Sequence, residues 1–306
     1  MPKVGILLGT LNGARFLPQQ LTSFERQTVP DWRLFVSDDG STDATLAILK
    51  TFQDKVGPDR VAIRSGPARG FVANFLSLAC DRSVRCDVYA FADQDDIWDS
   101  DKLARARQRL AEAPAGVPAM YCSRTRLIDD EGRDAGFSPL FKRPTSFRNA
   151  LVQNIAGGNT MVFNEEARQL LIKGGADVDV LAHDWWLYML TTAAGGCVIY
   201  DPHPAVRYRI HGKNLIGSNL GWHSRRLRAV LLMRGRFRQW TDRNIAALAR
   251  IVSAMTADNR KIFELFCRSR NESLIGRMLG ILRCRVYRQT AMGNLGLIIA
   301  TLTRRL

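Results

Sequence analysis

Short apolar runs alternate with helical patterns along the first third of the chain. The apolar runs occupy residues 4–8, 33–37, 61–64 and 88–92. The helical patterns that follow them occupy residues 17–24, 42–52, 71–80 and 99–111. This alternation predicts an α/β fold built on a parallel, doubly wound sheet.

Polar side chains follow each predicted strand. In chain order they are Thr10 and Asn12, Asp38 and Asp39, Arg69, and the acidic Asp93, Asp95 and Asp96. Ligands of an open parallel sheet bind outside the carboxyl ends of its strands. We therefore expect these side chains to surround a binding site.

The pattern becomes less regular from residue 119 onward. Its recognisable features are the segment Gly157-Gly158-Asn159, a helix near residues 183–191, and a strand pair near Val198 and Val206. We expect this half to complete the same sheet. The prediction is one domain over residues 1–220, with 1–118 and 119–220 as its halves.

The charge of the chain is concentrated near its C-terminal end. The 306 residues are 46% hydrophobic, enough for a sizeable core, and carry a net charge of +15. Residues 222–306 hold 18 Lys and Arg against 4 Asp and Glu, with apolar residues at helical spacing between them. Residues 221–306 are therefore predicted to form a C-terminal extension of two to four basic amphipathic helices. Such helices are typical of membrane surfaces, and a solvated helical bundle is the alternative.

Cysteine usage and hydropathy bear on the location of the protein. The six cysteines are scattered without a CxxC pair, and no secretory signal precedes them, which predicts free thiols in a reducing cytosol. The longest nearly apolar run, residues 291–303, is shorter than the roughly 20 residues that span a bilayer. We expect no transmembrane helix and a cytoplasmic protein.

The acidic residues at 93–96 repel one another unless a cation or hydrogen-bond donors neutralise them. Hard divalent cations prefer oxygen ligands, and Mg²⁺ is often bound by one or two carboxylates together with substrate phosphates. Capping of the helix that follows is the alternative.

The adjacent Asp38 and Asp39 also allow two interpretations. Gly40 and Ser41 suit a structural turn, whereas a carboxylate at a strand end can accept hydrogen bonds from a nucleoside. The GxGxxG fingerprint is absent, so no nicotinamide or flavin cofactor is expected.

Seven motifs in order carry a resemblance to inverting glycosyltransferase family 2, and to its bacterial rhamnosyltransferase-like members in particular. They are LLGTLNGARFL (7–17), VSDDGSTDAT (36–45), RSGPARGFVANF (64–75), FADQDDIWDSDKL (91–103), GGNTMVF (157–163), HDWWL (183–187) and YRIHGKNLIG (208–217). The resemblance covers roughly residues 1–220. It implies a GT-A fold, in which a half that binds a nucleotide-diphospho-sugar joins an acceptor half in one mixed sheet flanked by helices.

The resemblance also implies roles for individual residues. The implied nucleotide-sugar residues are Thr10, Asn12, Asp38, Asp39, Arg69, Asp93 and Arg209. Asp93 and Asp95 would form the metal-binding DxD motif for Mg²⁺ or Mn²⁺, with His211 as a further ligand. A structural histidine is the alternative for His211. Asp184 matches the catalytic base, although the family more often has Glu-Asp than His-Asp here, and a carboxylate at a helix N-terminus is the alternative.

Residues of a sugar or acceptor pocket are implied more weakly. They are Asp96, Trp98, Gly158, Asn159 and Trp185. The glycines at 157 and 158 either permit a close approach of the backbone to a sugar or form an ordinary tight turn. The tryptophans either stack on sugar rings or pack in the core. A further departure is Gly9, where many family members have proline.

These features predict a metal-dependent inverting glycosyltransferase of surface polysaccharide biosynthesis. The expected reaction moves L-rhamnose from dTDP-L-rhamnose to a glycan or lipid-linked glycan. With such an acceptor, the basic helices favour peripheral attachment to the anionic inner face of the cell membrane, and no nucleic-acid partner is expected. The alternatives are a UDP-hexose transferase of the same fold and a non-catalytic protein that binds membranes or nucleic acid.

Overall fold

The computed structural model describes residues 4–210 and 236–306. Its centre is a seven-stranded sheet in the order β10-β6-β9-β4-β1-β2-β3. The strands are β1 (Val4–Thr10), β2 (Trp32–Asp38), β3 (Val61–Ser65), β4 (Val88–Ala92), β6 (Ala119–Ser123), β9 (Val162–Asn164) and β10 (Cys197–Asp201). Strands β3, β2, β1 and β4 are parallel, and β9 is antiparallel to both β4 and β6. The predicted parallel sheet is confirmed for the first half, and the second half extends it.

Helices cover both faces of this sheet because its strands are apolar on both sides. One face is covered by α1 (Leu17–Glu25), α2 (Thr45–Val56) and α4 (Lys102–Leu110). The other is covered by α3 (Phe71–Cys80), α6 (Glu165–Gly174) and α7 (His183–Ala193). Along β1, Ile6 and Leu8 point to the first face and Leu7 to the second. Because β3, β2, β1 and β4 run in the same direction, the polar residues that follow each of them lie at one edge of the sheet.

A second, smaller sheet lies beside the first. It has the order β5-β11-β7-β8, with β5 (Ile97–Trp98), β11 (Val206–Arg209), β7 (Arg126–Ile128) and β8 (Asp134–Phe137). The two strands expected near Val198 and Val206 are present as β10 and β11, but they do not pair with each other, because β10 pairs with β6 while β11 pairs with β5 and β7. Pro202 and Pro204 lie between the two strands and lack the N–H groups that a hairpin ladder needs.

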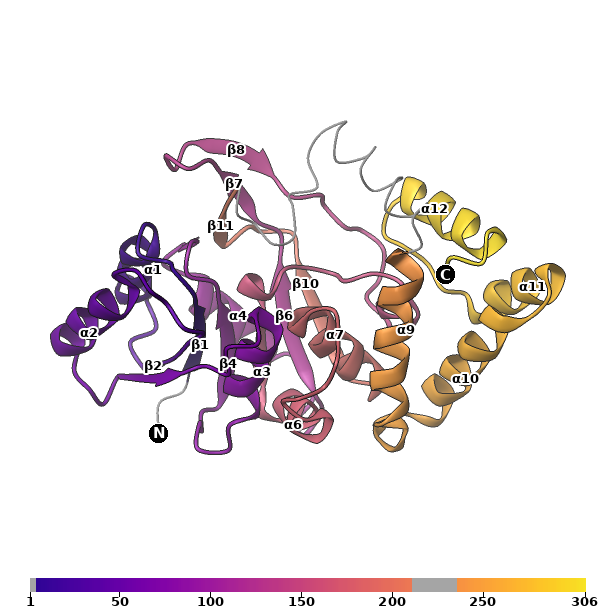
Figure 1. Ribbon diagram of the computed structural model, residues 1–306, viewed down its shortest axis with the longest axis horizontal. Coiled ribbons are helices and arrows are strands. Elements are labelled where there is room, and N and C mark those ends of the chain that lie inside the picture. The colour runs from indigo at the N-terminus through magenta and orange to yellow at the C-terminus, as the bar shows by residue number, and fades with distance from the viewer. Residues whose placement is uncertain (1–3, 211–235) are drawn as a thin grey trace.

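The chain after residue 235 is helical and lies at the end of the molecule farthest from α2 (Figure 1). Its α-helices are α9 (Arg236–Ala249), α10 (Ala257–Asn271), α11 (Leu274–Cys284) and α12 (Ala291–Leu302). The short helix η2 (Val252–Ala254) lies between α9 and α10, and two further short helices, α5 (Phe147–Ala150) and η1 (Gly158–Thr160), lie earlier in the chain. The predicted basic helices are thus present in residues 236–306, and all six cysteines are free. In the part of the chain that the structure describes, no helix has the length and apolar character needed to cross a membrane.

Candidate active site

A glutamine joins the loop after β1 to the loop after β4, residues 93–96, which we call the acidic loop. The side chain of Gln94 accepts a hydrogen bond from the Leu11 backbone N–H at 2.9 Å and donates one to the Leu11 carbonyl at 3.0 Å. A Cβ atom at Gly13 would lie 2.2 Å from Gln94 Oε1, so a side chain at this position would displace Gln94 from its bonds to Leu11. Two of the predicted site loops are therefore held together by one side chain.

The acidic loop itself concentrates negative charge. Asp96 is fully buried, and its carboxylate accepts from the Arg209 backbone N–H at 3.3 Å and from the Asn159 side-chain amide. Burial and the neighbouring Asp95 raise the pKa of Asp96 to about 8. Burial, followed by the negative charges of Asp96, Asp95 and Asp184, raises the pKa of Asp93 well above its ordinary value. The loop is therefore short of positive charge.

A buried lysine lies beside these carboxylates. Lys102, at the start of α4, is fully buried, and its Nζ lies 3.2 Å from the centroid of the Trp98 ring. Nζ has no hydrogen-bond partner among the described residues. Burial lowers the pKa of Lys102, and the charges of Asp96 and Asp93 oppose that shift. The sequence gives no sign of this position for Lys102, because a lysine in the first turn of a helix ordinarily points into solvent.

Asp184 lies next to the acidic loop, in the first turn of α7. Its carboxylate is buried and accepts from the backbone N–H groups of Gly158 at 3.0 Å and Trp185 at 2.6 Å. Burial raises the pKa of Asp184 to about 6, while these donors act in the opposite direction. The carboxylate is thus ionised at neutral pH and still a stronger base than an exposed aspartate.

His183 occupies the space that the glycine turn leaves. Its ring is buried, stacks on Phe75 at a centroid distance of 4.1 Å, and meets Phe91 edge-on at 4.7 Å. Neither ring nitrogen has a hydrogen-bond partner among the residues described, and burial lowers the pKa of His183 to about 3. A Cβ atom at Gly158 would lie 2.6 Å from His183 Nε2. Gly158 therefore makes room for the neutral side chain of His183.

The adjacent carboxylates after β2 already have protein donors. Asp38 accepts from the hydroxyls of Thr10 at 2.8 Å and Ser41 at 2.6 Å. Asp39 accepts from the backbone N–H groups of Ala68 at 2.7 Å and Gly70 at 2.8 Å. The pair is therefore stable without a ligand, and Asp38 forms the structural turn that was one of its two interpretations.

Asn12 and Arg69, which the resemblance places at the nucleotide, also make contacts within the protein. The Asn12 side chain accepts from the Thr42 backbone N–H at 2.8 Å, which joins the loops after β1 and β2. Arg69 forms an ion pair with Asp177, and both side chains are exposed. Arg69 thus lies at the outer end of the loop after β3, near the Asp39 contacts.

Arg209 connects three elements around the acidic loop. Its guanidinium donates to the carbonyl of Asp95 at 3.1 Å, to the carbonyls of Asp129 and Asp130 at 3.0 and 2.9 Å, and to Gln19 Oε1 at 2.6 Å. The residue is only 1% exposed, and its guanidinium lies over the Phe16 ring. These bonds make Arg209 a positioning residue for the acidic loop, whereas the sequence indicated contact with the nucleotide sugar.

Two of the tryptophans considered for the sugar pocket belong to the core. Trp98 is 3% exposed and packs edge-on against Phe24. Trp185 is 7% exposed, and its indole N–H donates to the Ala150 carbonyl at 2.7 Å. Neither side chain is open to a sugar, so of the two interpretations the structure supports core packing for both residues.

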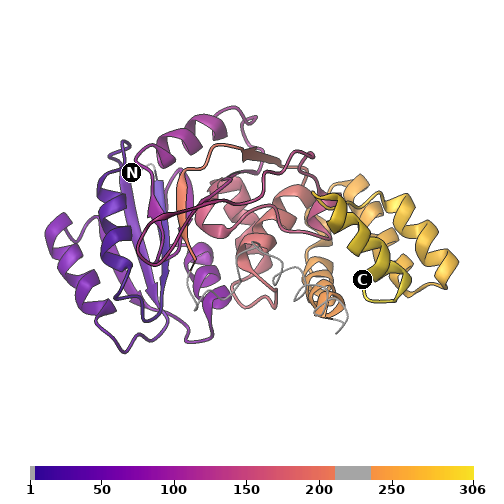
Figure 2. The same ribbon diagram turned by 90° about the horizontal axis from the view of Figure 1, so that it is seen from above.

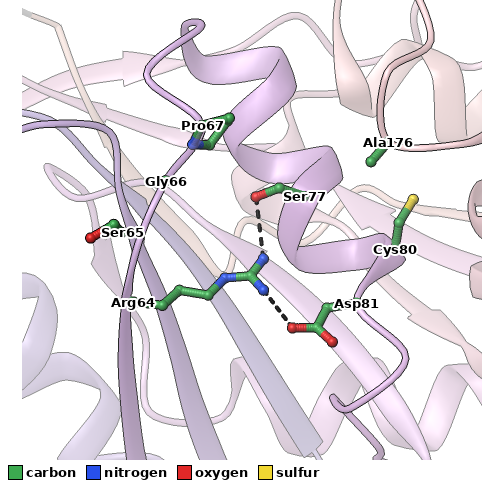
Figure 3. A pocket seen from close by; sticks show the side chains of 8 residues that line it. All are labelled: Arg64, Ser65, Gly66, Pro67, Ser77, Cys80, Asp81 and Ala176. Atoms are coloured by element: carbon green, nitrogen blue, oxygen red, sulfur yellow. Dashed lines mark hydrogen bonds and ion pairs between the residues drawn. The ribbon is translucent and has the colours of Figure 1, made fainter.

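A separate hollow of about 440 Å³ lies between the loop after β3 and α3 (Figure 3). Its lining residues are Arg64, Ser65, Gly66, Pro67, Ser77, Cys80, Asp81 and Ala176. Arg64 points across it to an ion pair with Asp81 and a hydrogen bond with Ser77 (Figure 3). None of the predicted site residues lines this hollow, and its charges are paired within the protein.

The carboxylates of the acidic loop suit a cation that takes most of its ligands from elsewhere. Within residues 4–210 and 236–306, no three His, Cys, Asp or Glu side chains form a complete metal site. His211 lies outside the described residues. A divalent cation bound by one or two carboxylates completes its shell with water and phosphate oxygens. The partly exposed Asp93 and Asp95, in a loop short of positive charge, fit that mode of binding.

The seven-stranded mixed sheet, with helices on both faces and carboxylates beyond its strand ends, has the arrangement of the GT-A fold. The family model for Glycosyl transferase family 2 matches residues 6–169. The chain is 30% identical to the dTDP-rhamnosyl transferase RfbG of Shigella flexneri over 257 residues, which are 79% of this chain and 84% of that protein. The chain therefore belongs to glycosyltransferase family 2 and is an enzyme of that family.

Other similarities agree with this assignment. The PGL/p-HBAD biosynthesis glycosyltransferase Rv2957 of Mycobacterium tuberculosis is 32% identical over 36% of this chain and 43% of its own length. The fold matches that of the mannosyltransferase PcManGT from Pyrobaculum calidifontis in complex with GDP-Man and Mn²⁺, with a TM-score of 0.53, 19% identity, and coverage of 99% and 86%. It also matches residues 1–349 of S. aureus TarS in complex with UDP, with a TM-score of 0.53, 14% identity, and coverage of 92% of this chain and 89% of that fragment.

Proposed function

We propose that the protein transfers L-rhamnose from dTDP-L-rhamnose to a glycan acceptor, with inversion at the anomeric carbon. The observation that carries the reaction is the position of Asp184, a buried carboxylate beside the acidic loop whose pKa is raised to about 6. The choice of donor is supported by the similarity to a dTDP-rhamnosyl transferase over most of both chains.

Asp184 serves as the general base in this proposal. It removes the proton of the acceptor hydroxyl as the hydroxyl oxygen attacks the anomeric carbon. The bond between that carbon and the diphosphate oxygen breaks on the opposite face, and the diphosphate leaves with the electron pair. The N–H groups of Gly158 and Trp185 hold the carboxylate in place for this step.

Mg²⁺ or Mn²⁺ is the proposed cofactor. Asp93 and Asp95 would hold it, and His211 is the further candidate ligand. When bound, such a cation neutralises the charge that develops on a departing diphosphate. Gln94 and Arg209 keep the loop that carries both aspartates in position through their bonds to Leu11 and to the Asp95 carbonyl.

The nucleoside is proposed to bind along the loops after β1, β2 and β3. A carboxylate has about four lone-pair positions, and Asp39 uses two of them for the N–H groups of Ala68 and Gly70. The remainder can accept from a pyrimidine N–H. Thr10, Asn12 and Asp38 shape these loops, and Arg69 is the nearby candidate for the diphosphate.

The proposed acceptor is a lipid-linked glycan of surface polysaccharide biosynthesis, at the cytoplasmic face of the membrane. In this scheme residues 1–220 form the transferase domain, of which 119–220 contributes the acceptor side. Residues 221–306 form the membrane-associating region. The excess of Lys and Arg over Asp and Glu in the last 85 residues supports an anionic membrane surface as the partner.

The donor is tested by calorimetric titration of dTDP and UDP into the protein with Mn²⁺, followed by hydrolysis of dTDP-L-rhamnose and UDP-hexoses. We expect tighter binding of dTDP and turnover of the rhamnosyl donor. Asp184→Asn is the matched control, because it retains nucleotide binding and loses turnover. Preferential binding of UDP together with turnover of a UDP-hexose would overturn the assignment to rhamnose.

A further inference from the structure

Two C-terminal helices expose an unusual amount of apolar surface. The described residues expose 13 large apolar side chains, and 9 of them lie on α11 and α12. We call this set the C-terminal apolar surface: Leu274, Ile275, Leu279 and Leu282 on α11, and Met292, Leu295, Ile298, Ile299 and Leu302 on α12. Scattered single residues need no explanation, but nine on two neighbouring helices indicate an interaction site. These helices lie at the C-terminal end of the molecule in both views (Figures 1 and 2).

The exposed side chains belong to helices that are firmly packed on their other faces. The guanidinium of Arg277 is buried and donates to the carbonyls of Thr301 and Leu302, which ties α11 to the end of α12. Ser273 and Thr290 cap the two helices with their side chains. The apolar surface is therefore a fixed feature of the folded chain.

Positive charge surrounds this surface. Residues 274–306 contain six arginines and no aspartate or glutamate. Arg283, Arg285 and Arg304 are exposed, and none of them forms an ion pair with a residue that the structure describes. A partner must accept both apolar side chains and unpaired guanidinium groups.

The combination of apolar side chains and unpaired arginines favours an anionic bilayer over a second copy of this chain as the partner. In a two-fold contact between copies of this chain, the same patch meets itself, so the arginines of both copies would face each other, and α11 and α12 carry no acidic residue of their own to separate them. Like charges at an interface are destabilising. A bilayer that contains anionic lipids instead offers an apolar layer below a negative surface.

We propose that α11 and α12 are the membrane-docking surface of the enzyme, lying in the plane of an anionic bilayer with the C-terminal apolar surface among the acyl chains. This inference deepens the proposed membrane attachment by naming the side chains that make it. The arginines would contact lipid phosphates at the rim. No sugar nucleotide takes part, so the docking can be tested separately from the choice of donor.

The test is flotation of the full-length protein with vesicles of phosphatidylcholine alone and of phosphatidylcholine with 30% phosphatidylglycerol. The triple variant Ile275→Gln, Leu279→Gln, Leu282→Gln is expected to lose at least about tenfold in affinity for the anionic vesicles, because each substitution removes apolar surface that the acyl chains would bury. Arg283→Gln is expected to weaken that binding about fivefold, the factor for one charge at such a surface, and to leave the neutral vesicles unaffected. Leu46→Gln is the matched control, because Leu46 is 46% exposed on α2 at the opposite end of the molecule.

Folding and alternative partners are checked on the same samples. All substituted positions are exposed, so each variant should retain the Tm of the wild type and its rate of donor hydrolysis in solution. The proposal would be overturned if the triple variant bound the anionic vesicles as tightly as the wild type does. It would also be overturned if the wild type bound neutral and anionic vesicles equally. A wild-type dimer in sedimentation experiments that the triple variant abolishes, without any vesicle binding, would assign the surface to a second copy instead.

Discussion

At Asp184, burial and hydrogen bonding act in opposite directions on one carboxylate. Burial raises its pKa to about 6, although two backbone N–H groups stabilise the charged form. Because the folded-state pKa exceeds the unfolded value near 3.8, ionisation of Asp184 reduces the stability of the fold as the pH rises through about 6. The same ionisation produces the base that the proposed reaction needs.

The first prediction concerns the pH dependence of this residue. The transfer rate should rise as the pH increases through about 6, because only the ionised carboxylate accepts a proton. Asp184→Asn should lower kcat by roughly 10² to 10⁴ and remove that rise. The measurement is kcat between pH 5 and 8.5 at saturating substrates. An unchanged profile in the variant would exclude Asp184 as the base.

Individual residue roles could be predicted from the sequence only where chemistry follows from local position. The placement of Asp93, Asp96 and Asp184 near one another followed from strand ends and motif order. Whether Arg209 reaches a ligand or the protein depends on Gln19 and on carbonyls after β7, far away in the chain. Lys102 was missed for the same reason, since its burial is a property of the packed structure.

At the scale of elements, β11 positions the active-site loop through Arg209. This strand contributes one buried and one exposed arginine, which differ in their partners. Arg209 donates to three separate segments, whereas Arg207 forms an ion pair with Asp99 at 3.1 Å. The two residues therefore allow the effect of burial on an arginine's contribution to stability to be compared within one strand.

The second prediction compares these two arginines. Arg209→Met should lower the free energy of unfolding by about 3 kcal/mol, because several buried acceptors lose charge-assisted hydrogen bonds. Arg207→Met should cost less than about 1 kcal/mol, as is usual for an exposed pair. The measurement is urea denaturation of both variants. Equal stabilities, together with a loss of nucleotide affinity in Arg209→Met, would return Arg209 to a direct binding role.

Helices and long strands were predictable because their apolar period is repeated several times. The strands β5, β7 and β8 are too short to show a period, so the second sheet was not foreseen. The sequence places β10 and β11 next to each other, but neighbours in sequence pair only as a tendency, and the prolines between these two strands disfavour a hairpin.

At the scale of the whole molecule, negative charge gathers at one edge of the sheet and positive charge at the C-terminal helices. The first 221 residues are nearly neutral, so the excess charge lies in the tail. The acidic loop is unfavourable on its own, as the raised pKa values of Asp93 and Asp96 indicate. A bound cation and nucleotide should relieve that cost and stabilise the fold.

The third prediction is the thermal shift that follows. Mn²⁺ and dTDP together, at about 100 times their dissociation constant, should stabilise the protein by about 2.7 kcal/mol and raise its Tm by roughly 5 °C. EDTA should abolish the rise, and Asp95→Asn should reduce it. The measurement is differential scanning calorimetry. An identical rise in EDTA would show that nucleotide binding does not involve a cation at this loop.

The bonds from Arg277 to the end of α12 have a consequence for binding kinetics. Many segments that bind surfaces are unstructured in solution and lose conformational entropy when they become helical at the surface. Here the helices are already ordered by their contacts with each other, so that entropy is lost once, during folding. Association at this end of the molecule therefore needs no coil-to-helix transition, and its rate is set by encounter and orientation alone.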